Sequence, residues 1–435
     1  MLYTIPDYYQ NFKCTADECE DTCCAGWQIA IDRKSLVRYG KVSGKFRRRL
    51  NRSIRWLEGT FKQGEGGRCA FLNEENLCDL YSALGKESLC RTCRLYPRHI
   101  EEFEGVREVT LSISCPEVAR ILLKKEEPAR FLEYEKEGEE AYEDFDLLVY
   151  SKLAEGREVM LNILRDRELG LELRTGLVLA LAHDMQVRLK KGEVFSCDQV
   201  FERYQKEKAR EFIRLKLMES GDNIEERYAF SRQMFQNLYQ LELLREDWES
   251  HLRESEYLLY GSMDDSQDSR DAYGKMHQDF AAWLTANMPE WEIQCEQLLV
   301  YFIYTYFCGA VYDGRAYAKI QMAVVSVMLI YEMLAARWRK NEKQLDFEDV
   351  VEIVYRYSRE VEHSDQNLEA MEQMMVEQLI PWFSKERCKE RIEGKEGKIM
   401  AVCIVVCMIV GYLFGCIQTG YIVGRVNKID IRDYG

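Results

Sequence analysis

Residues 14–27 read CTADECEDTCCAGW, and they hold Cys14, Cys19, Cys23 and Cys24. Thiolates are ligands for zinc and for iron–sulfur clusters, and four of them complete one site. Such a density of cysteines also interrupts any helical or strand period. We therefore expect a loop-rich module that a shared inorganic centre keeps in shape.

The first 120 residues contain nine of the 16 cysteines of the chain. The N-terminus has no charged segment followed by an apolar run, so no secretory signal is expected. Cytosolic thiols stay reduced, which favours metal or cluster ligation, with structural cysteines or disulfides as the alternatives. The scattered later cysteines are expected to be small packing residues; they are Cys197, Cys295, Cys308, Cys388, Cys403, Cys407 and Cys416.

The predicted fold class is mainly α. Residues 1–125 are expected to form the cysteine-rich, cluster-binding module, with loops and short strands near Val109–Ile113. Residues 126–393 are expected to form a helical domain, since apolar residues recur there at the spacing of one helix face; examples are Val178, Leu181, Ala182, Met185 and Leu189. No strand–GxGxxG–helix unit occurs, so a doubly wound nucleotide-binding core is not expected.

Residues 394–435 are expected to form a third unit. No charged residue occurs in 399–424, which exceeds the ~20 apolar residues that a membrane-spanning helix needs. We therefore expect one C-terminal transmembrane helix. More Lys and Arg precede this stretch than follow it, which keeps the body in the cytoplasm, anchored to the inner face of the membrane. A fused or misread gene junction is the alternative.

The charge balance concerns possible partners. The chain has 60 Lys and Arg against 75 Asp and Glu, a net charge of −15. A protein that binds nucleic acid over much of its surface is usually basic, so no nucleic-acid partner is expected.

Six segments form a specific set of motifs: Cys14–Asp32, Cys69–Tyr81, Thr92–Arg98, Leu111–Glu117, Gly309–Gly314 and Tyr357–Asp365. Over about residues 1–390, the set resembles flagellin lysine-N-methylases. The resemblance implies transfer of a methyl group from S-adenosylmethionine to lysine Nε of flagellin. It also implies a [4Fe-4S] cluster, while spacing alone leaves zinc as an alternative. The matching positions are Cys14, Cys19, Cys23, Cys24, Cys69, Cys78, Cys93 and Cys115, without Cys90.

Alternative functions stay open. Cys19 and Cys23 supply only part of the Cys-x3-Cys-x2-Cys motif of radical enzymes, so we expect a structural cluster and polar methyl transfer. A non-catalytic iron–sulfur or zinc-binding scaffold or sensor is the second hypothesis. A fusion with an incomplete acyltransferase is the third, because residues 411–435 resemble the first membrane helix and following loop of acyl-phosphate–glycerol-3-phosphate acyltransferases.

The first candidate for the methyl-transfer site is an aromatic segment that contains Tyr301, Tyr304 and Tyr306 and ends at Tyr312 and Asp313. Aromatic faces stabilise a cationic sulfonium or ammonium, and a desolvated pocket lowers the pKa of a lysine. We therefore assign catalytic roles to Tyr312 and Asp313. An ordinary aromatic core helix is the alternative.

The second candidate is polar. Arg356, Glu360, His363 and Asn367 are spaced by four, three and four residues, so they share one face of a continuous helix. Arg356, Glu360 and Asn367 are expected to bind the cofactor, and His363 to act as an acid or base. The alternatives are a solvated stripe, or a new helix capped at Ser364 and Asp365 that breaks the face.

Overall fold

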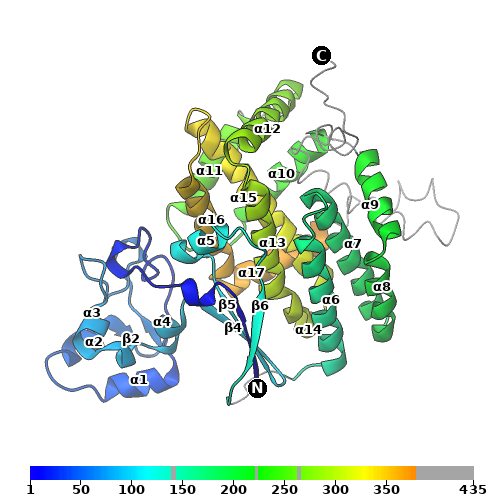
Figure 1. Cartoon of the computed structure of the whole chain (residues 1–435). Helices are drawn as coiled ribbons and strands as arrows, with labels where there is room; N and C mark the ends of the chain where they lie inside the picture. Colours follow the sequence, from blue (N-terminus) through cyan, green and yellow to red (C-terminus); the bar gives the residue numbers. More distant parts are fainter. Residues whose placement is uncertain (139–143, 221–223, 262–265, 379–435) are drawn as a thin grey trace.

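A computed structural model describes residues 1–138, 144–220, 224–261 and 266–378. Most of these residues are helical, which confirms the mainly α class. The cysteine module lies at one end of the molecule and the helices form the larger body beside it (Figure 1). The predicted transmembrane stretch 399–424, with Cys388, Cys403, Cys407 and Cys416, lies outside the described residues.

The cysteine module has short elements around a small core of its own. They are α1 (Arg33–Gly40), α2 (Arg47–Ser53), β2 (Ile54–Arg55), β3 (Thr60–Phe61), α3 (Asp79–Leu84) and α4 (Arg91–Leu95). Asp32 begins α1 because its carboxylate accepts a hydrogen bond from the Ser35 backbone N–H at 2.9 Å. Tyr39, Leu50 and Phe71 fill the centre of this core. So small a core gives limited stability, which is consistent with a module that needs a further constraint.

A mixed four-stranded sheet joins the N-terminus to the helical body. Its order is β4 (Arg98–Phe103), β5 (Val106–Leu111), β1 (Leu2–Pro6) and β6 (Phe131–Glu135). Strand β1 is parallel to β5, with Leu2 opposite Val106, and antiparallel to β6, with Leu2 opposite Glu135. The predicted domain boundary at residue 125 remains a prediction, although β6 lies beyond it and pairs with β1.

The helical body packs around one long helix, α15 (Ala316–Lys340). Its neighbours include α7, α11, α13, α16 and α17. The remaining bounds are α5 (Pro116–Leu123), α6 (Leu147–Arg165), α7 (Leu171–Lys190), α8 (Cys197–Tyr204), α9 (Glu207–Ser220), α10 (Ile224–Leu238), α11 (Trp248–Tyr260), α12 (Gln267–Asn287), α13 (Trp291–Tyr306), α14 (Ala310–Asp313), α16 (Phe347–Glu362) and α17 (Asp365–Gln378). The α7 residues Val178, Leu181, Ala182 and Met185 are buried, as their spacing predicts.

Helix α15 is apolar because other helices surround it. Among the described residues, it alone has the length and apolar character that could cross a membrane, and its most apolar 18-residue window is entirely buried in the protein. A helix that is covered on all sides loses the polar face that a surface helix keeps.

Candidate functional site

A cleft of about 590 Å³ separates the cysteine module from the helical body. Residues 19–22, 25–28 and 66–68 of the module form one wall, and residues 242–247, between α10 and α11, form the other. The volume lies within the range of sites for small molecules and cofactors. The lining includes five acidic residues and two arginines; they are Glu20, Asp21, Glu242, Glu246, Asp247, Arg68 and Arg245. Glu20, Asp21 and Asp247 pair with arginines, so Glu242 and Glu246 are the carboxylates that favour a cationic ligand.

The module wall depends on a close approach of two backbones at Gly67. This residue has a φ of +67°, and a Cβ atom placed there would lie 3.1 Å from the Gly26 nitrogen. The Gly26 N–H donates to the Gly67 carbonyl at 3.3 Å. Only glycine meets both the left-handed conformation and the lack of space. Gly26 is part of the motif Cys14–Asp32, so the motif also shapes the cleft.

Asp21 connects the two walls. Its carboxylate contacts Arg245 Nη1 at 2.7 Å and Arg359 Nη1 at 2.7 Å. Arg359, in α16, is buried and also donates from Nε to the Ser114 carbonyl at 2.8 Å. Two arginines of the helical body therefore hold the cysteine segment against α16.

All three predicted cofactor-binding residues contact the second wall of the cleft, residues 242–247, from the side of the helical body. The Glu360 carboxylate accepts a hydrogen bond from the Leu244 N–H at 3.0 Å. Asn367 accepts from the Glu242 N–H at 2.7 Å and donates to the Glu242 carbonyl at 2.9 Å. Arg356 donates to Asp247 at 2.9 Å. The structure thus brings Glu360 and Asn367 to the backbone of the wall segment and Arg356 to the Asp247 side chain, where they position the wall.

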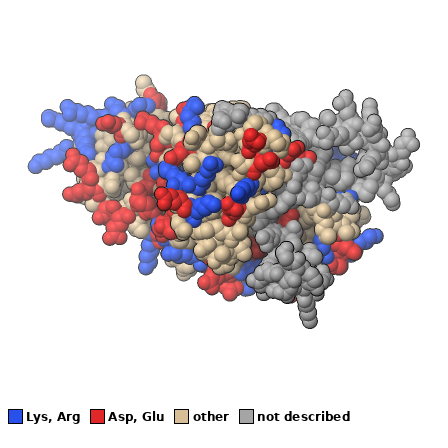
Figure 2. Space-filling view, turned by 90° about the horizontal axis from the view of Figure 1, so that it is seen from above, with Lys and Arg blue, Asp and Glu red and all other residues tan. Residues whose placement is uncertain are grey.

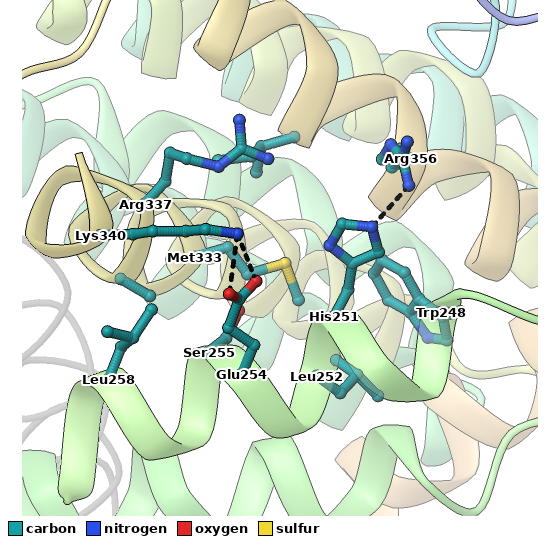
Figure 3. A pocket seen from close by; sticks show the side chains of 12 residues that line it. Trp248, His251, Leu252, Glu254, Ser255, Leu258, Met333, Arg337, Lys340 and Arg356 are labelled. Carbon is teal, nitrogen blue, oxygen red and sulfur yellow. Dashed lines mark hydrogen bonds and ion pairs between the residues drawn. The ribbon is translucent and has the colours of Figure 1, made fainter.

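Arg356 also reaches a small cavity between α11, α15 and α16. Figure 3 shows its guanidinium directed at His251, at 2.8 Å from Nε2. This cavity has a volume of about 40 Å³, which suits a water molecule rather than a cofactor. Burial, followed by the charge of Arg356, lowers the pKa of His251. The larger cleft is therefore the stronger candidate site.

His363 lies where α16 ends, beside the module wall. Its Nε2 is 2.7 Å from Ser114 Oγ, and its ring packs on Trp27, which lines the cleft, at 4.9 Å between centroids. Burial, helped by the nearby Arg359 charge, lowers the pKa of His363 to about 3. The imidazole is therefore neutral near pH 7. Helix α16 ends here and Ser364 Oγ accepts from the Asn367 N–H at 3.3 Å, so the predicted face is not one continuous helix.

Two tyrosines of the aromatic segment meet a buried carboxylate instead of a pocket. Tyr301 and Tyr306 each donate to Glu362 Oε2 at 2.5 Å, and Ser358 donates to Oε1 at 2.5 Å. Burial raises the pKa of Glu362. The sequence reasoning missed Glu362, although the spacing of four from Ser358 in the motif Tyr357–Asp365 was a signal for it.

The other members of the aromatic segment lie elsewhere. Tyr304 stacks near Arg157, whose guanidinium carbon is 4.2 Å from the ring centroid. Tyr312 is 42 % exposed and packs near Phe103, and Asp313 pairs with Lys319 at 2.8 Å. Tyr312 and Asp313 do not line the cleft.

The cysteines divide into two groups. Cys24, Cys69, Cys78, Cys90 and Cys93 share the core of the module, so Cys90 lies with the matching positions. Cys19, Cys23 and Cys115 lie near the charge of Arg359, and Cys14 is exposed. A hydrogen bond from Cys23 lowers the pKa of Cys24 to about 7, and one from Cys93 does the same for Cys90.

These thiols fit a soft metal by chemistry but not by arrangement. Two close pairs of thiols are the start of a ligand set for zinc or iron. Within the described ranges, however, no group of three or more His, Cys, Asp or Glu side chains is arranged to hold a metal ion.

The family model of the FliB lysine N-methylase C-terminal domain matches residues 157–382. The chain belongs to the FliB lysine N-methylase family. The match covers α7 to α17 and the last nine residues of α6, and so includes the helix end with Glu362 and His363. It does not reach the cysteine module, whose ligand role stays a prediction.

Relatives of the FliB lysine N-methylase family carry consistent names. A flagellar biosynthetic protein FliU from Salmonella muenchen is 30% identical over 131 residues, which are 28% of this chain and 78% of that protein. Lysine-N-methylases from Salmonella choleraesuis and Salmonella typhimurium are each 28% identical over 132 residues, or 28% of this chain and 33% of theirs. The chain thus spans about a third of the length of these two methylases. No solved structure matches it.

Proposed function

We propose that the chain is a protein-lysine N-methyltransferase that transfers a methyl group from S-adenosylmethionine to lysine Nε of flagellin. The observation that carries the proposal is the cleft of about 590 Å³ beside the end of α16, in a chain whose helical body matches a lysine N-methylase domain. The name of the FliU relative, a flagellar biosynthetic protein, supports flagellin as the substrate.

The lining of the cleft fits the proposed cofactor. Glu242 and Glu246 suit its cationic sulfonium and ammonium groups, and Arg68 suits its carboxylate. The Trp27 ring adds an aromatic face for the sulfonium. When bound, S-adenosylmethionine supplies an electrophilic methyl carbon, and the bond to sulfur breaks as the bond to the lysine nitrogen forms.

The residues of the chain then have positioning roles. Lysine must lose its proton before it attacks, and the carboxylates of the cleft are the acceptors within reach of a bound substrate. Glu360 and Asn367 fix the backbone that carries Glu242 and Glu246. Neutral His363 adds no positive charge next to a cationic cofactor. Preorganisation of this kind lowers the cost of aligning the two reactants.

We further propose that the cysteine module binds an iron–sulfur cluster with a structural role, with zinc as the alternative metal. The proposal rests on the chemistry of the five thiols in the core of the module, because thiolates are ligands for zinc and iron. Anaerobic purification with iron, sulfide and zinc counted per chain tests this. The proposed location is cytoplasmic, with residues 399–424 crossing the membrane.

The methyltransferase proposal is tested by cofactor binding and by mass spectrometry of flagellin lysines. Glu246 is exposed at the cleft, so Glu246→Lys is expected to fold and to weaken S-adenosylmethionine binding roughly tenfold. Glu211→Lys, on the exposed face of α9, is the matched control and should bind normally. A chain that binds the cofactor and leaves flagellin unmethylated would point to a different substrate. A chain that does not bind it would support the scaffold hypothesis.

A further inference from the structure

The cysteine module carries a strongly basic surface on an otherwise acidic chain. Residues 33–57 contain ten Lys or Arg and no Asp or Glu, while the whole chain has a net charge of −15. Figure 2 shows Lys and Arg side chains projecting from the end of the molecule that the module forms. Of the ten, Arg49 and Arg55 form ion pairs, and Arg38 donates hydrogen bonds to Ser35 and to the Ser88 and Leu89 carbonyls. The other seven have no ion pair within the described part of the chain; they are Arg33, Lys34, Lys41, Lys45, Arg47, Arg48 and Arg52.

Apolar side chains are exposed within the same surface. The turn between β2 and β3 presents Leu57 fully to solvent, at 104 % exposure, next to Trp56 at 39 %. This turn lies against α1: a Cβ atom placed at Gly59 would be 3.5 Å from Leu36 Cδ1. Val37, on the exposed side of α1, is 53 % exposed. An aromatic and a branched apolar residue therefore project from a turn that follows the basic helix α2. The acidic residue of this turn, Glu58, pairs with Arg55 at 3.2 Å.

We propose that this surface, formed by α1, α2 and the turn at residues 56–59, binds a membrane that contains anionic lipids. Lys and Arg next to a membrane surface are attracted to acidic headgroups. Trp and Leu side chains insert at the boundary between headgroups and acyl chains. Both features occur here on one surface, which is independent of the cleft and of the proposed methyl transfer.

The exposed turn favours a membrane over a nucleic acid. Phosphate backbones attract Lys and Arg, but a fully exposed Leu gains nothing from a polyphosphate. Burial of Trp56 and Leu57 in lipid removes apolar area from water. The uncharged stretch 399–424 of the same chain agrees with a position at a bilayer. With such a tail, the basic surface would orient the body on the membrane.

The test mixes the full chain with vesicles of phosphatidylcholine alone, or with added phosphatidylglycerol, and includes brominated lipids that quench nearby tryptophans. Anionic vesicles should quench part of the tryptophan emission, high salt should reverse this, and Trp56→Phe should remove that part. Arg47→Glu/Arg48→Glu/Arg52→Glu should lower the charge-dependent binding on the order of 100-fold, since each basic residue contributes about a factor of five. Binding through residues 399–424 would not depend on lipid charge.

The matched control is Lys190→Glu/Lys191→Glu/Lys208→Glu, which reverses three exposed charges of the helical body. It should bind anionic vesicles as the unmodified chain does. Leu57→Ser, at a fully exposed position, should fold normally and reduce the quenching, which separates lost binding from lost folding. Equal quenching with and without phosphatidylglycerol, an unchanged signal in Trp56→Phe, or a preference for RNA over anionic vesicles would overturn the proposal.

Discussion

Glu360 is buried behind the cleft wall, where its carboxylate holds the backbone of Leu244. Burial is the main cause that raises its pKa from 4.5 to about 7. The folded chain therefore binds more protons than the unfolded chain between these values, so the unfolding free energy falls as pH rises through this window. The full pKa shift corresponds to a change of about 3 kcal/mol in the unfolding free energy.

A Glu360→Gln variant tests this pH dependence. The amide keeps an acceptor for the Leu244 N–H but carries no titrating proton, so the loss of stability between pH 5 and 7.5 should become smaller than in the unmodified chain. Urea unfolding at the two pH values measures the difference. Glu369→Gln, on the exposed side of α17, should leave the pH dependence unchanged. A dependence that survives Glu360→Gln would mean that another group titrates.

Glu362 gives a second prediction for a single residue. Tyr301→Phe removes one of the three hydroxyl donors to this buried carboxylate, which should lower the unfolding free energy by about 1–3 kcal/mol. Tyr312→Phe changes a half-exposed ring and should stay within about 0.5 kcal/mol of the parent. Thermal unfolding of both variants measures the contrast. Equal stability of the two would show that the Tyr301 hydroxyl is not needed by Glu362.

At the level of elements, the conformation of wall segment 66–68 depends on glycine at position 67. Gly67→Ala combines a positive φ with a Cβ 3.1 Å from the Gly26 backbone nitrogen, so we expect a loss of about 2–3 kcal/mol and a distorted cleft. Gly66→Ala has a φ of +64° but nothing within 4 Å, so about 1 kcal/mol is expected. Urea unfolding and cofactor affinity report the two effects. A normal affinity in Gly67→Ala would separate this turn from ligand binding.

Helix α7 and strands β1 and β5 show which parts of the fold could be predicted from the sequence. The spacing of Val178, Ala182 and Met185 predicted correctly that these residues are buried. It did not predict that residues 173–182 are buried all round the helix, because α6, α8, α9 and α15 all pack against α7. The parallel pairing of β1 with β5 left no local signal, since Leu2 and Val106 are brought together only by the fold. Likewise, no pattern placed Asp21 between Arg245 and Arg359, because residues that close an interface carry no period.

In the whole molecule, Asp21 links the cysteine module to the helical body. Asp21→Asn leaves two arginines facing a neutral side chain, one of them buried, and should cost about 3 kcal/mol in the docking of the module. Hydrogen exchange of residues 14–28 should rise while that of α15 stays unchanged. Glu20→Gln disturbs a more exposed pair with Arg120 and should cost less than about 1 kcal/mol. Similar exchange in the two variants would contradict the role of Asp21.

The candidate site could be predicted only in part at this scale. The motif Tyr357–Asp365 pointed to the end of α16, where Glu362 and His363 lie. No motif marked the second wall of the cleft, residues 242–247. Glu360 and Asn367 bind the backbone of this segment, and backbone groups are the same in every residue, so the sequence gives no sign of these contacts. The catalytic and cofactor-binding assignments remain predictions for mutagenesis.

The central position of β1 bears on how the chain reaches its native state. Its partners β5 and β6 lie more than one hundred residues away in the sequence. Closing such long loops costs entropy before any hydrogen bond forms, so the pairing of β1 should be a slow step of refolding. Before β1 pairs, the unpaired edges of β5 and β6 can form hydrogen bonds with strands of other copies of the chain, which leads to aggregation. Dilution and low temperature during refolding should therefore improve the yield of soluble protein.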